Sequence, residues 1–209
     1  MHRMTSPLLA ISDRRAFGDE GFLGWLAALG RAGVGAVQLR EKDLDDRALF
    51  ELVRSARALL PPATRLLVNG RLDVALAAGA DGAHLPADGV PLAALRRRFG
   101  PGVLLGRSTH RPDEVEAARR DGADYVTFGP VYPTPGKERY GQPPGLAGLA
   151  AATARNGGAG IPVYALGGVT LRRLAEVAAA GAAGAAGIRL FQDPDDLPRL
   201  TAAAKAAWT

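Results

Sequence analysis

The residues most suited to chemistry combine positive charges with neutral hydrogen-bond donors. Gln38, Arg40 and Lys42 alternate within one short run, so an extended backbone points their side chains the same way. Asn69 and Ser108 end or follow later apolar runs. Guanidinium and ammonium groups beside amide and hydroxyl donors suit a phosphate or pyrophosphate. These five residues therefore predict an anionic, phosphate-bearing substrate.

The longest stretch without periodicity is the segment 129–145, which is rich in proline and glycine. Such a composition excludes a continuous helix. The segment carries Thr134 and Lys137, and long loops at strand ends are where folds of this kind keep ligand contacts. We expect Thr134 to bind substrate and Lys137 to take part in catalysis; the alternative is an insertion without function.

Two glycine-rich turns near the carboxyl terminus predict a phosphate-binding cup. The runs ALGGVT and GIRLFQD each end or follow an apolar segment. Backbone N–H groups at paired turns of this kind hold phosphate in many barrels. The residues expected to do so are Gly167, Gly168, Gly187 and Ile188, with Arg189 adding charge.

Histidine supplies the candidate acid or base, because its side chain titrates near neutral pH. His110 follows Ser108 at a strand end and is the best general acid–base candidate, although a structural hydrogen bond is an alternative role. His84 lies within a predicted strand and is expected to be a core or rim residue. The predicted catalytic set is therefore His110, Ser108 and Lys137.

One phrase recurs along the chain: a helical segment ending in Ala-Gly or Asp-Gly, then a short apolar run, as in RAGVGAVQLR, AAGADGAHL, RDGADYVTFG and AAGAAGAAGIRL. Glycine just beyond a helix is a common left-handed cap. The repeat predicts eight strands, at 8–12, 35–40, 65–69, 82–85, 103–106, 124–129, 161–166 and 184–189.

The intervals between these strands have helical periodicity. One predicted helix face, for example, carries Leu49, Leu52, Val53, Ala56, Leu59 and Leu60. Alternating strands and helices indicate a parallel sheet. Eight units in 209 residues favour a single (β/α)8 TIM barrel, an α/β fold, as one domain spanning 1–209.

Composition excludes several function classes. The chain has no cysteine, so disulfides and thiolate metal sites are excluded, and a cytoplasmic location is expected. The net charge of +5 is scattered without aromatic residues between the basic ones, so we expect no nucleic-acid partner. No apolar run reaches membrane-span length, and the start of the chain leads straight into a strand, so we expect no membrane partner and no signal peptide. A homo-oligomer is possible, but one sequence predicts no interface.

Several motifs together resemble the thiamine phosphate synthase/TenI family. In chain order they are QLREK, LVNGRLDVALAAGADGAHLP, GRSTH, DYVTFGPVYPTPGK and IPVYALGGV. The resemblance covers nearly the whole chain and implies a (β/α)8 barrel enzyme. Synthases of this family join a hydroxymethylpyrimidine diphosphate to a thiazole phosphate, releasing pyrophosphate with Mg²⁺.

The resemblance also implies roles for the residues identified above. It places Gln38, Arg40 and Lys42 on the pyrophosphate side, assisted by Asn69 and Lys137. It places Ser108 near the pyrimidine and Thr134 beside the thiazole, and it assigns the thiazole phosphate to the cup formed by Gly167, Gly168, Gly187 and Ile188.

Two departures bear on the reaction. Synthases usually have aspartates that hold Mg²⁺ after the third and fourth strands, where this chain has Gly70 and Gly89. We therefore expect no metal and no cofactor, with Mg²⁺ needed only if the chain is a synthase. The NGR and LP motifs resemble the TenI branch, whose enzymes aromatise a thiazole phosphate carboxylate tautomer without metal. That branch places its catalytic histidine where this chain has Pro130, so His110 is the candidate base.

The sequence thus favours a TenI-like thiazole tautomerase or a close relative that binds a thiazole phosphate. One alternative is a thiamine phosphate synthase with altered Mg²⁺ ligation, which would also bind the pyrimidine diphosphate. Another is a non-catalytic protein that binds thiazole phosphate or thiamine phosphate.

Overall fold

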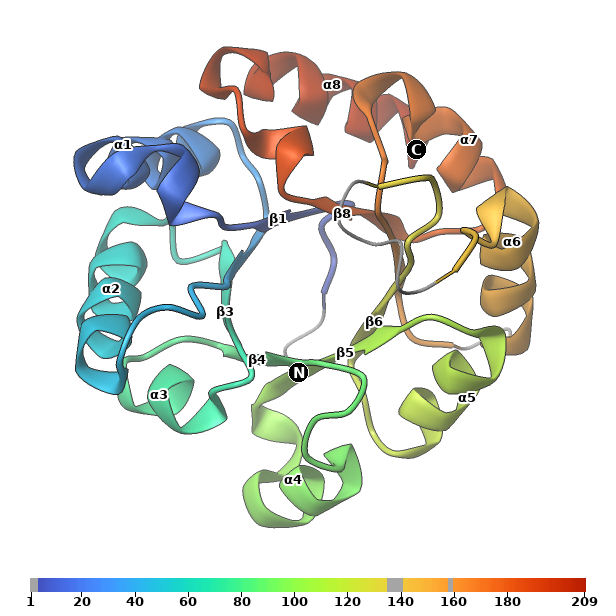
Figure 1. Cartoon of the computed structure of the whole chain (residues 1–209), viewed down its shortest axis with the longest axis horizontal. Coiled ribbons are helices and arrows are strands. Elements are labelled where there is room, and N and C mark those ends of the chain that lie inside the picture. Colours follow the sequence, from blue (N-terminus) through green and yellow to red (C-terminus); the bar gives the residue numbers. More distant parts are fainter. Residues whose placement is uncertain (1–3, 135–140, 158–159) are drawn as a thin grey trace.

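Eight parallel strands form the inner ring of the molecule and helices surround them (Figure 1). The structure, a computed structural model, describes residues 4–134, 141–157 and 160–209. The strands follow one another around the ring in chain order, and β8 pairs with β1 to close it. The predicted (β/α)8 TIM barrel is confirmed.

The strands lie close to their predicted positions. They are β1 Leu8–Ile11, β2 Ala36–Leu39, β3 Arg65–Asn69, β4 Gly82–Leu85, β5 Leu104–Thr109, β6 Tyr125–Phe128, β7 Val163–Leu166 and β8 Gly184–Gly187. Only β5 is clearly longer than predicted. Ser108 and Thr109 continue the strand because they pair with Thr127 and Phe128 of β6.

A helix follows each strand. The helices are α1 Gly18–Arg31, α2 Asp46–Leu59, α3 Leu72–Ala77, α4 Leu92–Phe99, α5 Pro112–Arg120, α6 Gly145–Arg155, α7 Leu174–Ala179 and α8 Leu197–Ala207. None of the helices in the described ranges is both long and apolar enough to span a bilayer.

The second helix shows how local sequence sets an element. The Asp45 side chain accepts a hydrogen bond from the Ala48 N–H at 2.8 Å and so caps α2. The apolar face that packs on the barrel consists of Leu49, Val53 and Ala56. Leu59 was predicted on this face but is 42% exposed. The helix ends at Leu59, and the extended backbone at the next residue buries the Leu60 side chain instead.

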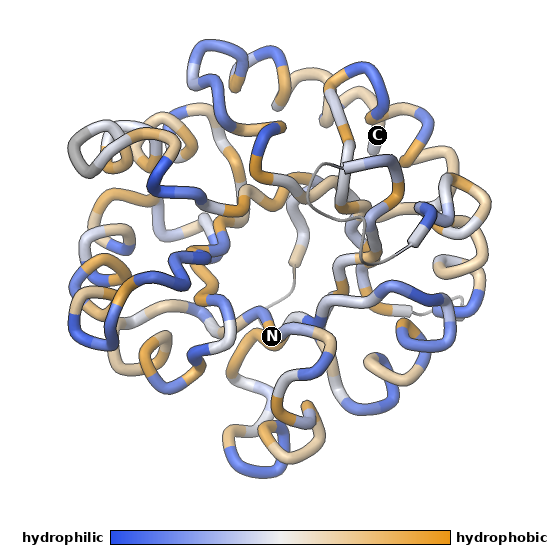
Figure 2. The backbone as a smooth tube through the Cα atoms, viewed as in Figure 1, coloured by the Kyte–Doolittle hydropathy of each residue, from blue (hydrophilic) through white to orange (hydrophobic). Residues whose placement is uncertain are grey.

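Strand residues alternate between two cores. One set of side chains fills the barrel interior, including Leu9, Leu67, Leu104, Tyr125 and Tyr164, and the other packs beneath the helices. Figure 2 shows hydrophilic residues mainly on the outer turns of the helices and in the loops. Side chains on the interior set, at the carboxyl ends of the strands, are therefore the ones positioned to meet a ligand.

Candidate functional site

Two amide side chains meet at the carboxyl ends of β2 and β3. The buried Gln38 Nε2 donates to Asn69 Oδ1 at 3.2 Å. The two strands are parallel neighbours, with Leu39 opposite Val68. Because Asn69 accepts this bond through its oxygen, its amide nitrogen remains directed elsewhere as a donor. The structure therefore brings these two predicted binding residues together.

The loop after β2 is fixed by a carboxylate that was not among the predicted site residues. The Glu41 side chain is 7% exposed and accepts hydrogen bonds from the Ser12 hydroxyl and, at 3.2 Å, from the Arg14 N–H. The Ser12 hydroxyl in turn accepts from the Arg40 N–H at 2.8 Å. Glu41 thus anchors the loop that carries Arg40 and Lys42. Its position between two cations was the available signal.

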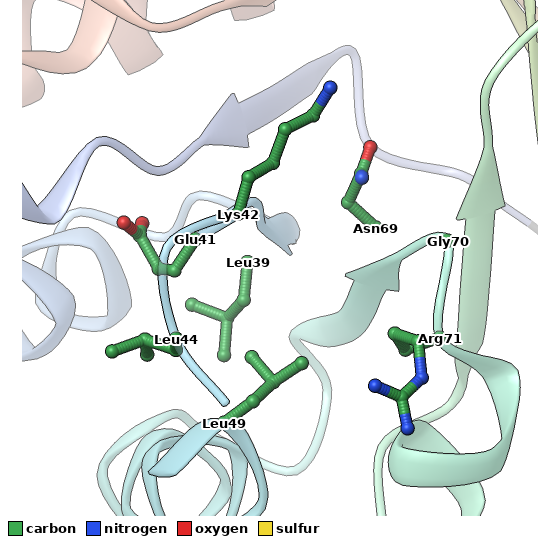
Figure 3. Close-up of a pocket in the computed structure, with 8 residues that line it drawn as sticks. All are labelled: Leu39, Glu41, Lys42, Leu44, Leu49, Asn69, Gly70 and Arg71. Atoms are coloured by element: carbon green, nitrogen blue, oxygen red, sulfur yellow. The ribbon is translucent and has the colours of Figure 1, made fainter. Parts of the chain in front are cut away.

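A cavity of about 280 Å³ opens beside this loop, between the ends of β2 and β3. Figure 3 shows the Lys42 and Asn69 side chains extending to the same side, whereas Arg71 turns away below Gly70. The apolar part of the lining consists of Leu39, Leu44 and Leu49. A polar rim above an apolar floor suits an organic anion.

Ser108 is held by a histidine in the barrel interior. Its Oγ lies 2.9 Å from Nε2 of His84, whose Nδ1 lies 2.9 Å from the Tyr125 hydroxyl. His84 is 3% exposed and Ser108 is half-buried, so the serine is the member of this group that can reach a ligand. The predicted core or rim position of His84 is confirmed, because the ring is buried and hydrogen-bonded through both nitrogens.

His110 lies in the turn after β5. Its Nδ1 is within hydrogen-bond distance of the Gly129 carbonyl oxygen, and its backbone N–H donates to the Glu114 carboxylate at 2.7 Å. These contacts place the ring beside the turn after β6, next to Pro130. The catalytic role of His110 stays a prediction.

The loop after β6 packs directly on the glycine turn after β7. The backbone N–H of Tyr132 donates to the Gly167 carbonyl at 3.1 Å. A Cβ at Gly167, where φ is +92°, would lie 2.6 Å from Cα of Pro130 and 3.2 Å from the Thr134 hydroxyl. Only glycine permits this approach. Thr134 therefore lies beside the predicted phosphate cup, whereas Lys137 lies outside the described residues.

The second half of the predicted cup follows β8, which pairs with β7. Ile188 packs against the interior core and Arg189 is exposed, with Gly187 at the strand end. Neither the Gly168 nor the Ile188 N–H donates a hydrogen bond to any residue in the described part of the chain. Two turns whose backbone N–H donors have no acceptor among the described residues thus lie side by side, as an anion-binding cup requires. Phosphate binding there stays a prediction.

An arginine on the outer side of β5 organises the loop after β4. Arg107 is 8% exposed, and its guanidinium donates to the carbonyls of Pro86 at 2.7 Å and Val90 at 2.6 Å, with longer bonds to Ala87 and Gly89. The loop that carries Gly89 is therefore wrapped around a positive charge. No local sequence pattern identifies this residue.

Comparison with known proteins gives consistent matches along the barrel. Residues 8–191 match the family described as thiamine monophosphate synthase. A putative thiamine-phosphate synthase of Geobacter sulfurreducens is 46% identical over 204 residues, 97% of this chain and 94% of that protein. The putative thiamine-phosphate synthase 2 of Aquifex aeolicus is 40% identical over 185 residues, 88% of this chain and 96% of that protein. The solved thiamine phosphate pyrophosphorylase from Pyrococcus furiosus superposes with a TM-score of 0.82 at 28% identity, covering 98% of this chain and 96% of that one.

Proposed function

We propose that this chain, which belongs to the thiamine monophosphate synthase family, joins a hydroxymethylpyrimidine diphosphate to a thiazole phosphate and releases pyrophosphate. The observation that carries the proposal is the grouping of Gln38, Asn69 and Lys42 at one strand edge. The names of relatives at 46% and 40% identity support this synthase over the thiazole tautomerase that the sequence alone favoured.

In the proposed reaction the protein positions the two reactants and forms no covalent bond with either of them. The bond between the pyrimidine methylene carbon and the diphosphate oxygen breaks, and pyrophosphate leaves with the electron pair. The thiazole nitrogen then bonds to the same carbon. Arg40 and Lys42 stabilise the leaving anion by charge, and the Asn69 amide donates to its oxygens. Ser108 contacts the pyrimidine.

The thiazole partner is assigned to the other side of the barrel mouth. Its phosphate binds the backbone donors of the turns after β7 and β8, and Thr134 lies beside Gly167 to contact the ring. Strands β2 and β3 hold the departing anion, while β7 and β8 hold the phosphate of the acceptor. The two anionic groups are thereby kept apart, and the reacting atoms meet between them.

The described side chains do not by themselves supply the near-octahedral set of oxygen ligands that Mg²⁺ takes. In residues 4–134, 141–157 and 160–209 there is no group of three acidic, histidine or cysteine side chains that could hold a metal. Asp73, the carboxylate nearest Gly70 in sequence, pairs with Arg71 at 2.7 Å. The loop after β4 holds the Arg107 guanidinium instead of a cation from solution. We therefore assign the neutralisation of the diphosphate to Arg40 and Lys42.

The direct test combines the purified protein with both substrates. Thiamine phosphate should form, measured as fluorescent thiochrome after oxidation, and Lys42→Ala should lower the rate about 10- to 100-fold because a charge-assisted contact is lost. Lys205→Ala, at an exposed position of α8, is the matched control and should leave the rate unchanged. Equal rates for the two variants would contradict the role of Lys42, and no product from the wild type would contradict the synthase.

A metal-independent thiazole tautomerase is the second candidate. The observation that favours it is the lack of carboxylates at Gly70 and Gly89, together with His110 placed beside Pro130. If the protein forms no thiamine phosphate but accelerates aromatisation of the thiazole tautomer, and His110→Ala abolishes that activity, the tautomerase replaces the synthase.

Restoring carboxylates should create a dependence on Mg²⁺. A Cβ at Gly70 meets no atom within 4 Å, and its φ of +72° is a conformation that aspartate tolerates better than most residues. Gly89 is tighter, with a Cβ 3.1 Å from the Pro86 carbonyl oxygen. We expect Gly70→Asp combined with Gly89→Asp to raise thiamine phosphate formation when Mg²⁺ is added.

The control for that variant is Gly79→Asp. Gly79 also has an open Cβ position and a φ of +78°, but it lies beyond α3, away from the carboxyl ends of the strands. This variant should have a similar loss of stability from placing aspartate at a positive φ, and its activity should not respond to Mg²⁺. A double aspartate variant whose activity is equally indifferent to Mg²⁺ would refute the argument that these two glycines remove a metal site.

A further inference from the structure

Three polar side chains form a line from the barrel interior to its carboxyl end. The Tyr125 hydroxyl lies 2.9 Å from Nδ1 of His84, and Nε2 of the same ring lies 2.9 Å from the Ser108 hydroxyl. The Thr127 hydroxyl is farther from Nε2, at 3.4 Å. Tyr125 and His84 are buried, and Ser108 is half-buried. The line therefore ends at the one member that a ligand can reach.

We infer that His84 is a positioning residue that fixes the direction in which Ser108 donates its hydrogen bond. Tyr125 donates to Nδ1, the Nε2–H donates to the Ser108 oxygen, and the Ser108 proton is directed to the ligand. Ser108 then selects a hydrogen-bond acceptor, such as an aromatic ring nitrogen, and disfavours a donor at that place. The inference rests on the proposed function in one respect, that Ser108 contacts the pyrimidine.

The donor-to-acceptor direction of the hydrogen bonds along this line follows from the buried Tyr125 hydroxyl. Among the described residues, His84 is the only hydrogen-bond partner of the Tyr125 hydroxyl, which is completely buried. Burial raises the pKa of Tyr125 well above its usual value of 10, so the phenol keeps its proton. A buried O–H without an acceptor costs about 1–3 kcal/mol, so this proton goes to Nδ1. A neutral imidazole that accepts at Nδ1 carries its own proton on Nε2.

The histidine is neutral in this arrangement, as the direction requires. Burial, with smaller contributions from the Arg107 and Arg40 guanidinium groups, lowers the pKa of His84 from 6.5 to about 3. A cationic ring would donate from both nitrogens and leave the Tyr125 proton without an acceptor.

Packing against Gly106 and Tyr164 fixes the position of the Tyr125 ring. A Cβ at Gly106 would lie 2.2 Å from Cζ of Tyr125 and 2.4 Å from its hydroxyl, so the phenol lies across a glycine of β5. The Tyr164 ring packs against it edge-on at 5.8 Å, and the Tyr164 hydroxyl donates to the Ser6 carbonyl at 2.5 Å. A rigid aromatic support of this kind fixes the first donor of the line.

The first measurement uses the wild-type protein without ligand. The ¹⁵N shifts of His84 in long-range ¹H–¹⁵N spectra should show the tautomer protonated on Nε2, and Tyr125→Phe should shift that ring towards a mixture because Nδ1 loses its donor. A His84 ring protonated on Nδ1 in the wild type would overturn the inference.

The second measurement separates positioning from mere packing with a pair of variants. In His84→Gln the amide reaches the place of Nε2 and can donate to Ser108, whereas in His84→Asn the shorter amide reaches only the place of Nδ1. The probe is hydroxymethylpyrimidine diphosphate, with affinity measured by calorimetry. We expect His84→Asn to weaken binding about tenfold, as Ser108→Ala does, and His84→Gln to bind within about threefold of the wild type.

The outcomes are distinct. Unchanged affinity in both His84 variants, with their melting temperatures maintained, would show that the histidine only fills space and would overturn the inference. A wild type that does not bind the pyrimidine diphosphate would contradict the proposed function instead. In that case the tautomer measurement still decides whether Tyr125 and His84 set the direction of the Ser108 hydroxyl.

Discussion

Arg107→Ala is expected to lower the free energy of unfolding by about 2–4 kcal/mol. The 8% exposed guanidinium donates to carbonyls at both ends of the loop after β4, with bonds of 2.7 Å to Pro86 and 2.6 Å to Val90. Hydrogen bonds from a charged donor are worth more than neutral ones, and truncation leaves carbonyl groups partly buried without partners. The removed side chain also leaves a cavity between β5 and the loop.

Two further variants make the measurement specific. Arg107→Lys keeps the charge but replaces a planar fork by a point charge that cannot reach both ends of the loop, so about half the loss should remain. Arg97→Ala removes an exposed arginine of α4 and should cost less than about 1 kcal/mol. Urea denaturation gives all three values. If Arg107→Ala costs no more than Arg97→Ala, the guanidinium does not organise the loop.

The same arginine bears on the metal-free reaction that we propose. Gly70 and Gly89 supply no carboxylates, and Arg107 places a buried cation beneath the loop that carries Gly89. Without a carboxylate in that loop, bringing Mg²⁺ to it would place two positive centres near each other at a cost in Coulomb energy, which the aspartates of the double variant would offset. The metal-free character we propose therefore belongs to the loop as a whole.

Much of the fold was predictable because each repeat contains local sequence signals. Glycine beyond each helix and a short apolar run after it specify a strand each time, and parallel strands of this number close into a barrel. Gln38 and Asn69 stand at the ends of two neighbouring strands, so the same logic places them at one edge of the barrel. The structure joins their side chains by a hydrogen bond.

The rest depended on contacts between residues far apart in sequence. Arg96 belongs to a run of three arginines that local sequence does not tell apart, yet it donates to the Gly122 carbonyl at 2.7 Å and pairs with Asp124. Glu41 stands between two cations in the sequence and anchors their loop. Tyr125 is a core residue whose hydroxyl also meets the His84 ring. In each case the partner lies on another strand or loop, and no local periodicity reports it.

Acidification is expected to destabilise the protein through His84, above the pH at which carboxylates protonate. Burial, with smaller effects of Arg107 and Arg40, lowers the pKa of His84 from 6.5 to about 3. The unfolded chain therefore binds a proton between these pH values that the folded protein does not bind. The free energy of unfolding falls as the pH falls through this window, by up to about 1.4 kcal/mol per pH unit, and the contribution is complete above pH 6.5.

His84→Gln isolates this contribution because glutamine does not titrate. The charged groups that act on His84, Arg40 after β2 and Arg107 in β5, remain positive throughout. From pH 6.5 to pH 4, the stability of the wild type relative to His84→Gln should fall by about 3 kcal/mol in urea denaturation. Any constant cost of the substitution cancels, because only the change with pH is compared. A difference that stays constant across this range would mean that folded His84 accepts a proton, and a protonated ring could not hold the Tyr125 and Ser108 hydroxyls in the direction we infer.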